Sequence, residues 1–214
     1  MLEPARKIRR SSVKNIVRFP SVKSNGGKSI LVESILESKY CLHLEFDKAV
    51  ASYSPQPQTF RLNTPVGPVR YTPDFLVNYH SGLICYVEVK PLLQSLKSDY
   101  QNLFTCFRDY IETPNVKFIH VDENMIYQKP LINNYEFLYK FLKRPEIDMG
   151  KLISFSKKFP TCVHLKDLIN EISKDISIGE VYTWLALGYL YFDMSKEMLN
   201  FNTEVSFNEQ LTLD

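Results

Sequence analysis

The sequence has few of the residues that build disulfide-rich or zinc-binding proteins. Four cysteines occur among 214 residues, and no two are spaced as Cys-x-x-Cys. They are Cys41, Cys85, Cys106 and Cys162. Because all four lie in apolar segments, we expect buried, reduced thiols rather than disulfides or a zinc site.

Long apolar runs are also missing. No run reaches the roughly 18 apolar residues of a membrane span, and the basic N-terminal residues are not followed by the apolar segment of a secretory signal. We therefore expect a cytoplasmic protein that does not contact membranes. Hydrophobic residues make up 44% of the chain, which is enough for one large core or for a core and a small second domain.

Positive charge is concentrated at the N-terminus, although the net charge is only +2. Residues 1–28 contain eight Lys or Arg residues and one acid, Glu3. Such an arm can neutralise the phosphates of a nucleic acid, and it can equally be a solvated tail. The candidate DNA contacts in this arm are Arg6, Arg9, Arg10 and Lys14.

The order of apolar patterns predicts an α/β domain. We expect a helix capped by Ser29 and running to about Leu44, with Glu33 beside its apolar side. The other expected elements are strands at 49–57, 60–63, 75–79, 84–90 and 116–121 and helices at 94–111 and 130–143. A turn at residues 80–83 pairs two of these strands as an antiparallel hairpin. The later strand, helix and strand form a parallel crossover.

A second, smaller domain is expected after a boundary in residues 143–150. Helices at 163–172 and 181–188 and two strands within 189–207 give the element order of a winged helix. Gly188 suits the end of the second helix, and Trp184 is expected in the core. Because residues 175–188 contain no Lys or Arg, we expect this domain to bind a protein partner rather than DNA.

Three charged residues interrupt the apolar strands of the first domain. Glu88 and Lys90 point to the same face of their strand because side chains alternate. Asp74 begins the preceding strand, and the hairpin turn can bring it beside Glu88. Two close carboxylates raise each other's pKa unless a cation lies between them, and oxygen ligands favour Mg²⁺, with Mn²⁺ as a substitute.

Lys90 cannot be a metal ligand while it is protonated. It can orient or activate an attacking water, or stabilise negative charge on a phosphate in the transition state. A Glu-x-Lys motif by itself in a strand usually belongs to an ordinary charged surface, so the hypothesis depends on the complete pattern. That pattern is "TPD" at the start of one strand and "VEVK" on the next.

Residues 70–91 resemble the PD-(D/E)xK nuclease superfamily, with Pro73-Asp74 and Glu88-Val89-Lys90 as the signature. The order of "LEFDKAV", "QP", "YTPDF" and "VEVKP", followed by a winged-helix-like tail, is similar to TnsA. TnsA is the endonuclease subunit of heteromeric cut-and-paste transposons of prokaryotes. This resemblance extends over nearly all of the chain.

The resemblance implies three parts: a basic arm at 1–28, a restriction-endonuclease-like nuclease domain at 29–146 with a mixed sheet flanked by helices, and a winged-helix-like partner-binding domain at 147–214. It also implies that the protein cuts the 5′, non-transferred strand of double-stranded DNA at transposon ends. The implied partners are a TnsB-type DDE transposase and a TnsC-type AAA+ ATPase.

The resemblance assigns metal binding to Asp74, Glu88 and the helical acid, and the catalytic lysine to Lys90. The helical acid is assigned to Glu33; Glu37, expected further toward solvent, is the alternative, and Glu45 and Asp47 also lie nearby. The backbone oxygen of Val89 is a further candidate ligand. Gln56 is either a DNA contact or a turn residue between two prolines. His80 and His120 are not required once a metal is present.

Two other functions fit parts of the pattern. One is a restriction or resolvase-type nuclease that acts alone, which the TnsA-like order and the tail argue against. The other is a non-catalytic adaptor that tethers a transposition protein to DNA, which the intact acidic residues and Lys90 argue against. Of the three, the sequence favours a metal-dependent endonuclease of a transposition system.

Overall fold

The computed structural model describes residues 15–24, 26–143 and 147–208. The chain divides into two compact units, Met1–Tyr127 and Gln128–Asp214. Among the described residues, no helix combines the length and the apolar character needed to cross a membrane.

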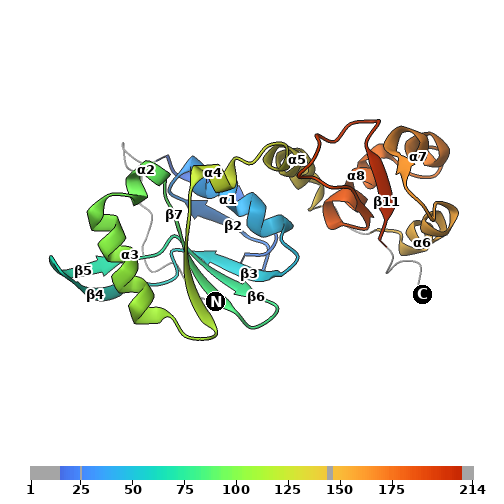
Figure 1. Ribbon diagram of the computed structural model, residues 1–214. Helices are drawn as coiled ribbons and strands as arrows, with labels where there is room; N and C mark the ends of the chain where they lie inside the picture. The colour runs from blue at the N-terminus through green and yellow to red at the C-terminus, as the bar shows by residue number, and fades with distance from the viewer. Residues whose placement is uncertain (1–14, 25, 144–146, 209–214) are drawn as a thin grey trace. The chain divides into compact units, whose positions relative to one another are not determined.

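A four-stranded mixed sheet forms the centre of the first unit (Figure 1). Its strands, in spatial order, are β3 (Val50–Pro55), β6 (Phe75–Tyr79), β7 (Ile84–Val89) and β8 (Val116–Val121). β3 pairs with β6, and β6 with β7, in antiparallel fashion, whereas β7 and β8 are parallel. The predicted hairpin and the predicted parallel crossover are therefore both confirmed.

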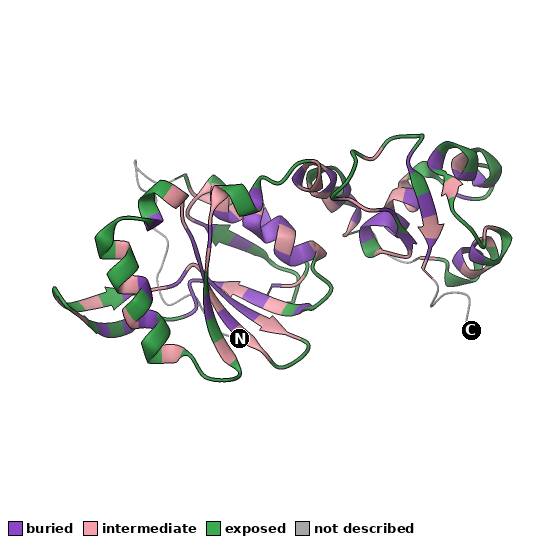
Figure 2. Ribbon diagram, viewed as in Figure 1, coloured by how far each residue is buried: buried purple, intermediate pink, exposed green. Residues whose placement is uncertain are grey.

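Helices pack against both faces of this sheet. The α1 helix (Ile35–Phe46) places Tyr40 against Phe75 of β6, with 5.7 Å between ring centroids. The α3 helix (Ser98–Ile111) covers the other face, where Phe107 lies 5.1 Å from the ring of Phe118 on β8. Figure 2 shows buried residues along the central strands and α1, and exposed residues on the outer side of α3. Short helices α2 (Leu92–Ser95) and α4 (Glu123–Ile126) follow β7 and β8.

Two separate antiparallel ribbons complete the first unit. One joins β1 (Val17–Pro20) to β2 (Ser29–Val32), and the other joins β4 (Phe60–Thr64) to β5 (Gly67–Tyr71). The β5 strand was not expected from the sequence. Its buried face contributes Tyr71 to an aromatic core formed with Phe60, Phe104, Phe107 and Phe118.

The first helix begins later than predicted. Residues 29–32 form β2 instead of the first turn of a helix, and Ser34, not Ser29, is the N-cap. The Ser34 hydroxyl accepts a hydrogen bond from the backbone N–H of Glu37, which satisfies one of the free donors at the helix start. The run Ser-Ile-Leu-Val, which is rich in β-branched and apolar residues, pairs with β1. This pairing buries every second side chain of the run.

The second unit contains four helices and a small three-stranded sheet among its described residues, as well as a short 3₁₀ helix at Tyr139–Phe141. The helices are α5 (Leu131–Leu138), α6 (Met149–Lys158), α7 (Leu165–Ile172) and α8 (Ile178–Leu187). The strands, in spatial order, are β10 (Leu190–Tyr191), β11 (Glu204–Phe207) and β9 (Val163–His164). Trp184 is fully buried, and Gly188 ends α8 in the left-handed conformation, both as predicted.

The boundary between the units lies at Tyr127, about twenty residues before the predicted one. The α5 helix was expected in the nuclease domain, but its contacts are with the second unit. Asn134 of α5 is 1% exposed, donates to the backbone oxygens of Met194 and Glu197, and accepts from the N–H of Leu199. The α6 helix, which the sequence analysis assigned to no element, begins at the end of the expected boundary.

Candidate active site

The antiparallel pairing of β6 and β7 brings the signature residues together. Phe75 is opposite Val87, so the same register places Asp74 opposite Glu88. The carboxylate of Asp74 accepts a hydrogen bond from the backbone N–H of Val89 at 2.8 Å. Asp74 is therefore fixed at the end of β7, beside the strand that carries Glu88 and Lys90.

Glu88 and Lys90 form an ion pair with 3.0 Å between Nζ and Oε1. The second carboxylate oxygen of Glu88 accepts a hydrogen bond from the hydroxyl of Tyr71 at 2.9 Å. The Lys90 ammonium also lies over the ring of Tyr100, 4.5 Å from its centroid. The alternation of side chains along β7 thus correctly predicted that Glu88 and Lys90 are neighbours. It did not predict their contacts with the two tyrosines.

The carboxylates oppose one another's ionisation. Burial raises the pKa of Asp74 well above its ordinary value, and the charges of Glu88 and Glu37 raise it further. Burial also raises the pKa of Glu37, with Glu33 and Glu88 adding to it, against hydrogen bonds from the Glu33 N–H and Ser34. This mutual repulsion means that a cation between the acids would favour their charged forms.

For Lys90, the neighbouring charges favour the ionised form of the side chain. Burial by itself would lower the pKa of Lys90, but the neighbouring Glu88 and Asp74 carboxylates outweigh burial and raise it. The amine therefore stays protonated near neutral pH. It serves as a fixed positive charge rather than as a general base.

The acid on the first helix is Glu37 rather than Glu33. Glu33 precedes the N-cap and lies outside α1, so its predicted place on the helix is wrong. Glu37 lies in the first turn and is 5% exposed, whereas the sequence analysis placed it toward solvent. Its carboxylate accepts hydrogen bonds from the Glu33 N–H and the Ser34 hydroxyl. The error follows from counting Leu31 and Val32 toward the apolar side of the helix, although both belong to β2.

A cavity of about 310 Å³ opens beside these residues. Its lining comes from the start of α1, the start of β6 and the end of β7: Glu33, Ser34, Leu36, Glu37, Asp74, Val89, Lys90, Pro91 and Gln94. Asp74, Lys90 and both candidate helical acids thus share one open space. Glu88 does not line the cavity; its two oxygens contact Lys90 and Tyr71.

The donor set fits a hard divalent cation. Among the described residues, no three His, Cys, Asp or Glu side chains form a ready-made metal cluster. Mg²⁺ does not require one, because it commonly keeps several waters and uses one or two protein carboxylates with substrate phosphates. Asp74 and Glu37, both with raised pKa values beside one cavity, are acids of the kind such an ion would bind.

Gln56 lies behind Asp74 in a strained conformation. Its backbone N–H donates to the backbone oxygen of Asp74 at 2.8 Å, and its φ of 46° is unusual for a residue with a side chain. The side chain is 3% exposed, and its amide oxygen has no hydrogen-bond partner among the described residues. Gln56 is therefore a buried support for Asp74, and its side chain offers DNA no exposed group.

The remaining candidates lie elsewhere. Arg6, Arg9, Arg10 and Lys14 fall outside the described residues. His80 is exposed in the β6–β7 turn, and His120 on β8 binds the backbone oxygen of Lys90 at 2.8 Å. Sequence analysis missed Tyr71 and Tyr100, since aromatic residues at strand and helix spacing look like ordinary core.

The four cysteines form no disulfide. Cys41 and Cys85 are buried and Cys106 is half-buried, but Cys162 is exposed, in contrast to the prediction. Cys162 lies in the loop before β9, where no apolar side of a helix or strand covers it.

Comparison with known families supports the nuclease signature. Residues 47–123 match the family described as "TnsA-like endonuclease N terminal". The matched segment contains Gln56, Asp74, Glu88 and Lys90 but not α1, which carries Glu37. The comparison with curated proteins gave no match.

Proposed function

We propose, from the match of residues 47–123 to the TnsA-like endonuclease family, that the protein is a Mg²⁺-dependent endonuclease that cuts the 5′, non-transferred strand at transposon ends. The observation that carries the proposal is the single cavity in which Asp74, Glu37 and Lys90 meet. Hydrolysis would join the oxygen of a water to phosphorus and break the bond to O3′, leaving a 5′-phosphate and a 3′-hydroxyl.

The proposed role of each side chain follows from its charge. Asp74 and Glu37 would hold the cation, with the backbone oxygen of Val89 as a further ligand. When bound, Mg²⁺ would supply positive charge to the phosphate and lower the pKa of the nucleophilic water. Lys90, kept protonated by Glu88, would stabilise the negative charge that develops on the phosphate.

Glu88 has a less direct role in this proposal than the sequence pattern gave it. Its carboxylate fixes Lys90 on one side and accepts from Tyr71 on the other. Because Glu88 does not line the cavity, it would chiefly hold the lysine in position and add negative charge to the cation site. Mn²⁺ would substitute for Mg²⁺, since it accepts the same oxygen ligands.

We assign protein binding to the second unit. The order α6, β9, α7, α8, β10 and β11 matches that of a winged helix, which supports this fold for residues 147–208. The α8 helix, in the position of a recognition helix, contains no Lys or Arg. This supports a protein partner, namely a TnsB-type transposase or a TnsC-type ATPase.

Strand-resolved cleavage tests the proposal. Transposon-end DNA, labelled on either strand, would be incubated with Mg²⁺, the full chain, and the proposed transposase and ATPase partners. We expect nicking of the 5′ strand by the wild type and a loss of about 100-fold or more for Asp74→Asn and Glu37→Gln, since each removes a charged ligand.

Glu33→Gln is the matched control, because Glu33 lines the same cavity but lies outside α1. We expect it to retain cleavage within about tenfold of the wild type. Mg²⁺ binding to the protein alone, followed by calorimetry, gives a second readout that requires no partner. Normal 5′ nicking by Asp74→Asn would refute the assignment of the site, and equal losses for Glu33→Gln and Glu37→Gln would refute the choice of Glu37.

A further inference from the structure

Two arginines face each other across the β4–β5 ribbon. Arg61 and Arg70 are directly opposite in the antiparallel register, and both are exposed. Like charges at opposite positions in neighbouring strands destabilise the pair. Among the described residues, neither side chain has an ion pair or a hydrogen bond that would offset this repulsion.

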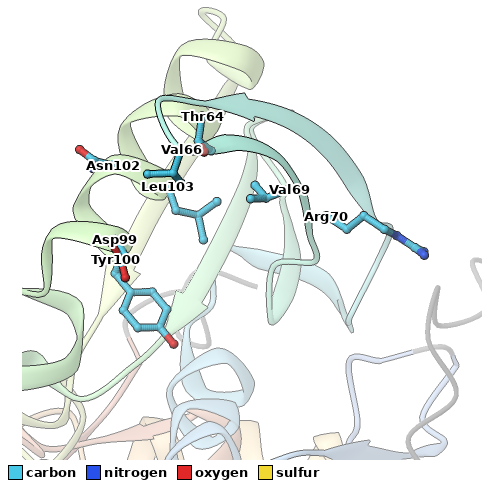
Figure 3. A pocket seen from close by; sticks show the side chains of 8 residues that line it. All are labelled: Thr64, Val66, Val69, Arg70, Asp99, Tyr100, Asn102 and Leu103. Carbon is cyan, nitrogen blue, oxygen red and sulfur yellow. The ribbon is translucent and has the colours of Figure 1, made fainter.

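The core determines where the two arginines point. Phe60 and Tyr71, the neighbours of the arginines along the strands, pack on Phe107 of α3 at ring-centroid distances of 4.9 and 4.7 Å. Because side chains alternate along a strand, Arg61 and Arg70 must extend from the opposite face. Arg70 is among the residues that line the cavity between the ribbon and α3, but Figure 3 shows its side chain extending away from Val69 and Leu103.

The outer face of the ribbon is therefore positive and carries no acid. Its four side chains, on alternate positions of the two strands, are Arg61, Asn63, Pro68 and Arg70. No Asp or Glu occurs anywhere in residues 60–71. Asp99 of α3 lies across the cavity on the inner side and forms no ion pair with Arg70. A polyanion is the ligand that this face complements.

The ribbon is joined directly to the candidate active site. Tyr71, next to Arg70, donates its hydroxyl proton to the carboxylate of Glu88. Three residues lie between Arg70 and Asp74, and the four chain steps limit their Cα distance to about 14 Å. Since successive phosphates of one DNA strand rise by about 3.4 Å along the axis, this distance corresponds to roughly four nucleotides of one strand.

We propose that the outer face of the β4–β5 ribbon binds the backbone of duplex DNA beside the cleavage site, through contacts of Arg61 and Arg70 with phosphates. This inference rests on the proposed nuclease function and assigns part of its DNA-binding surface. Phosphate contacts position the duplex without reading its sequence. The unpaired arginines are then explained, because the DNA supplies the negative charge that the protein does not.

Equilibrium binding of a fluorescent duplex to the full chain tests this proposal. Anisotropy would be measured with EDTA, so that no strand is cut, between about 50 and 200 mM salt. Removing two phosphate contacts in Arg61→Ser/Arg70→Ser should make the slope of log K against log salt shallower by about 2. The double variant should also bind roughly tenfold more weakly at the middle of this range.

Two further double variants serve as controls. Arg61→Lys/Arg70→Lys keeps both charges and should keep the wild-type slope. Lys48→Ser/Lys117→Ser also removes two exposed charges, but near Val50 and Cys85, at the sheet end opposite Asp74, and should bind like the wild type. Circular dichroism and thermal melting would establish that all variants are folded.

The outcomes separate this inference from the nuclease proposal. The ribbon assignment would be overturned if Arg61→Ser/Arg70→Ser kept the wild-type slope, or if Lys48→Ser/Lys117→Ser lost as much affinity. It would also be overturned if Arg61→Lys/Arg70→Lys had a reduced slope, or if the wild type showed no measurable binding. If the ribbon variant weakens binding as expected while the wild type cuts no DNA under any condition, the ribbon assignment stands and the nuclease proposal fails.

Discussion

Asp74 is a carboxylic acid in surroundings that oppose its charged form. Its pKa is raised by burial and by the charges of Glu88 and Glu37. In the unfolded chain the same group ionises near its ordinary pKa of 3.8. Between these two pKa values the folded state binds more protons than the unfolded state, so the stability contributed by this group falls as pH rises.

Asp74→Asn should therefore stabilise the protein in the absence of divalent ions. We expect a higher melting temperature than for the wild type at neutral pH, and a difference that shrinks as pH falls toward the ordinary pKa of aspartate. Mg²⁺ should raise the melting temperature of the wild type and have a smaller effect on the variant, because only the wild type keeps the full charge of the site. Differential scanning fluorimetry across pH, with and without Mg²⁺, measures both effects.

A lower stability of Asp74→Asn would contradict this prediction. A variant that is less stable than the wild type in EDTA at neutral pH would mean that the acids do not repel one another. The raised pKa of Asp74 would then be wrong, and with it the argument that this cluster of acids favours a cation.

Gln56 supports Asp74 at the cost of backbone strain. With φ at 46°, glycine is the residue that fits this position best. Both Gln56→Gly and Gln56→Ala remove the buried amide, so comparing the two variants isolates the effect of the backbone. We expect the glycine variant to be more stable than the alanine variant by about 1 kcal/mol, the reverse of their usual order.

Urea denaturation of the two Gln56 variants measures this difference. A result in which alanine is equally stable or more stable would show that residue 56 does not hold the left-handed conformation in solution. Because the backbone N–H of residue 56 binds Asp74 in either variant, cleavage activity should depend on the lost amide and not on which small residue replaces it.

At the scale of elements, α5 illustrates how one side chain can decide which unit a helix belongs to. Asn134 satisfies two backbone carbonyls and one N–H in the segment between β10 and β11. Asn134→Ala removes all three hydrogen bonds of this buried side chain. At about 1 kcal/mol for each bond, we expect the second unit to lose roughly 3 kcal/mol of stability.

Asn133→Ala is the matched control for this prediction. Asn133 is on the same helix and half-buried, so the change in helix propensity is the same, but the contacts of Asn134 are kept. We expect a change within about 0.5 kcal/mol, measured by chemical denaturation. Similar losses for both variants would mean that the helix itself, rather than the three hydrogen bonds, sets the stability.

For the whole molecule, the position of the boundary makes a prediction about fragments. If α5 belongs to the second unit, residues 128–214 should unfold in one cooperative transition when expressed alone. Residues 147–214, which follow the boundary expected from the sequence, lack α5 and should melt at a markedly lower temperature or lack a cooperative transition.

Calorimetry of the two fragments distinguishes the two boundaries. Equal melting temperatures would place α5 outside the cooperative unit. The complementary fragment 1–127 should retain Mg²⁺ binding, because α1, β6 and β7 all lie within it.

The central hairpin and the crossover could be predicted from sequence because their signals are local. Alternation along β7 fixed the neighbourhood of Glu88 and Lys90, a four-residue turn fixed the pairing with β6, and the motif residues of the TnsA-like segment are close in the chain. The same applies to Trp184 and Gly188, whose places follow from an apolar helix and from the conformational freedom of glycine.

Tertiary structure decided what depends on partners far apart in sequence. Residues 29–32 became a strand because β1 was available to pair with them, and this shift made Glu37, not Glu33, the helical acid beside Asp74. Pairing of β5 with β4 exposed two opposed arginines, and three hydrogen bonds from Asn134 assigned α5 to the second unit. Local patterns set the backbone conformation that each segment prefers, whereas packing between distant segments determines which of its faces is buried and which group meets the site.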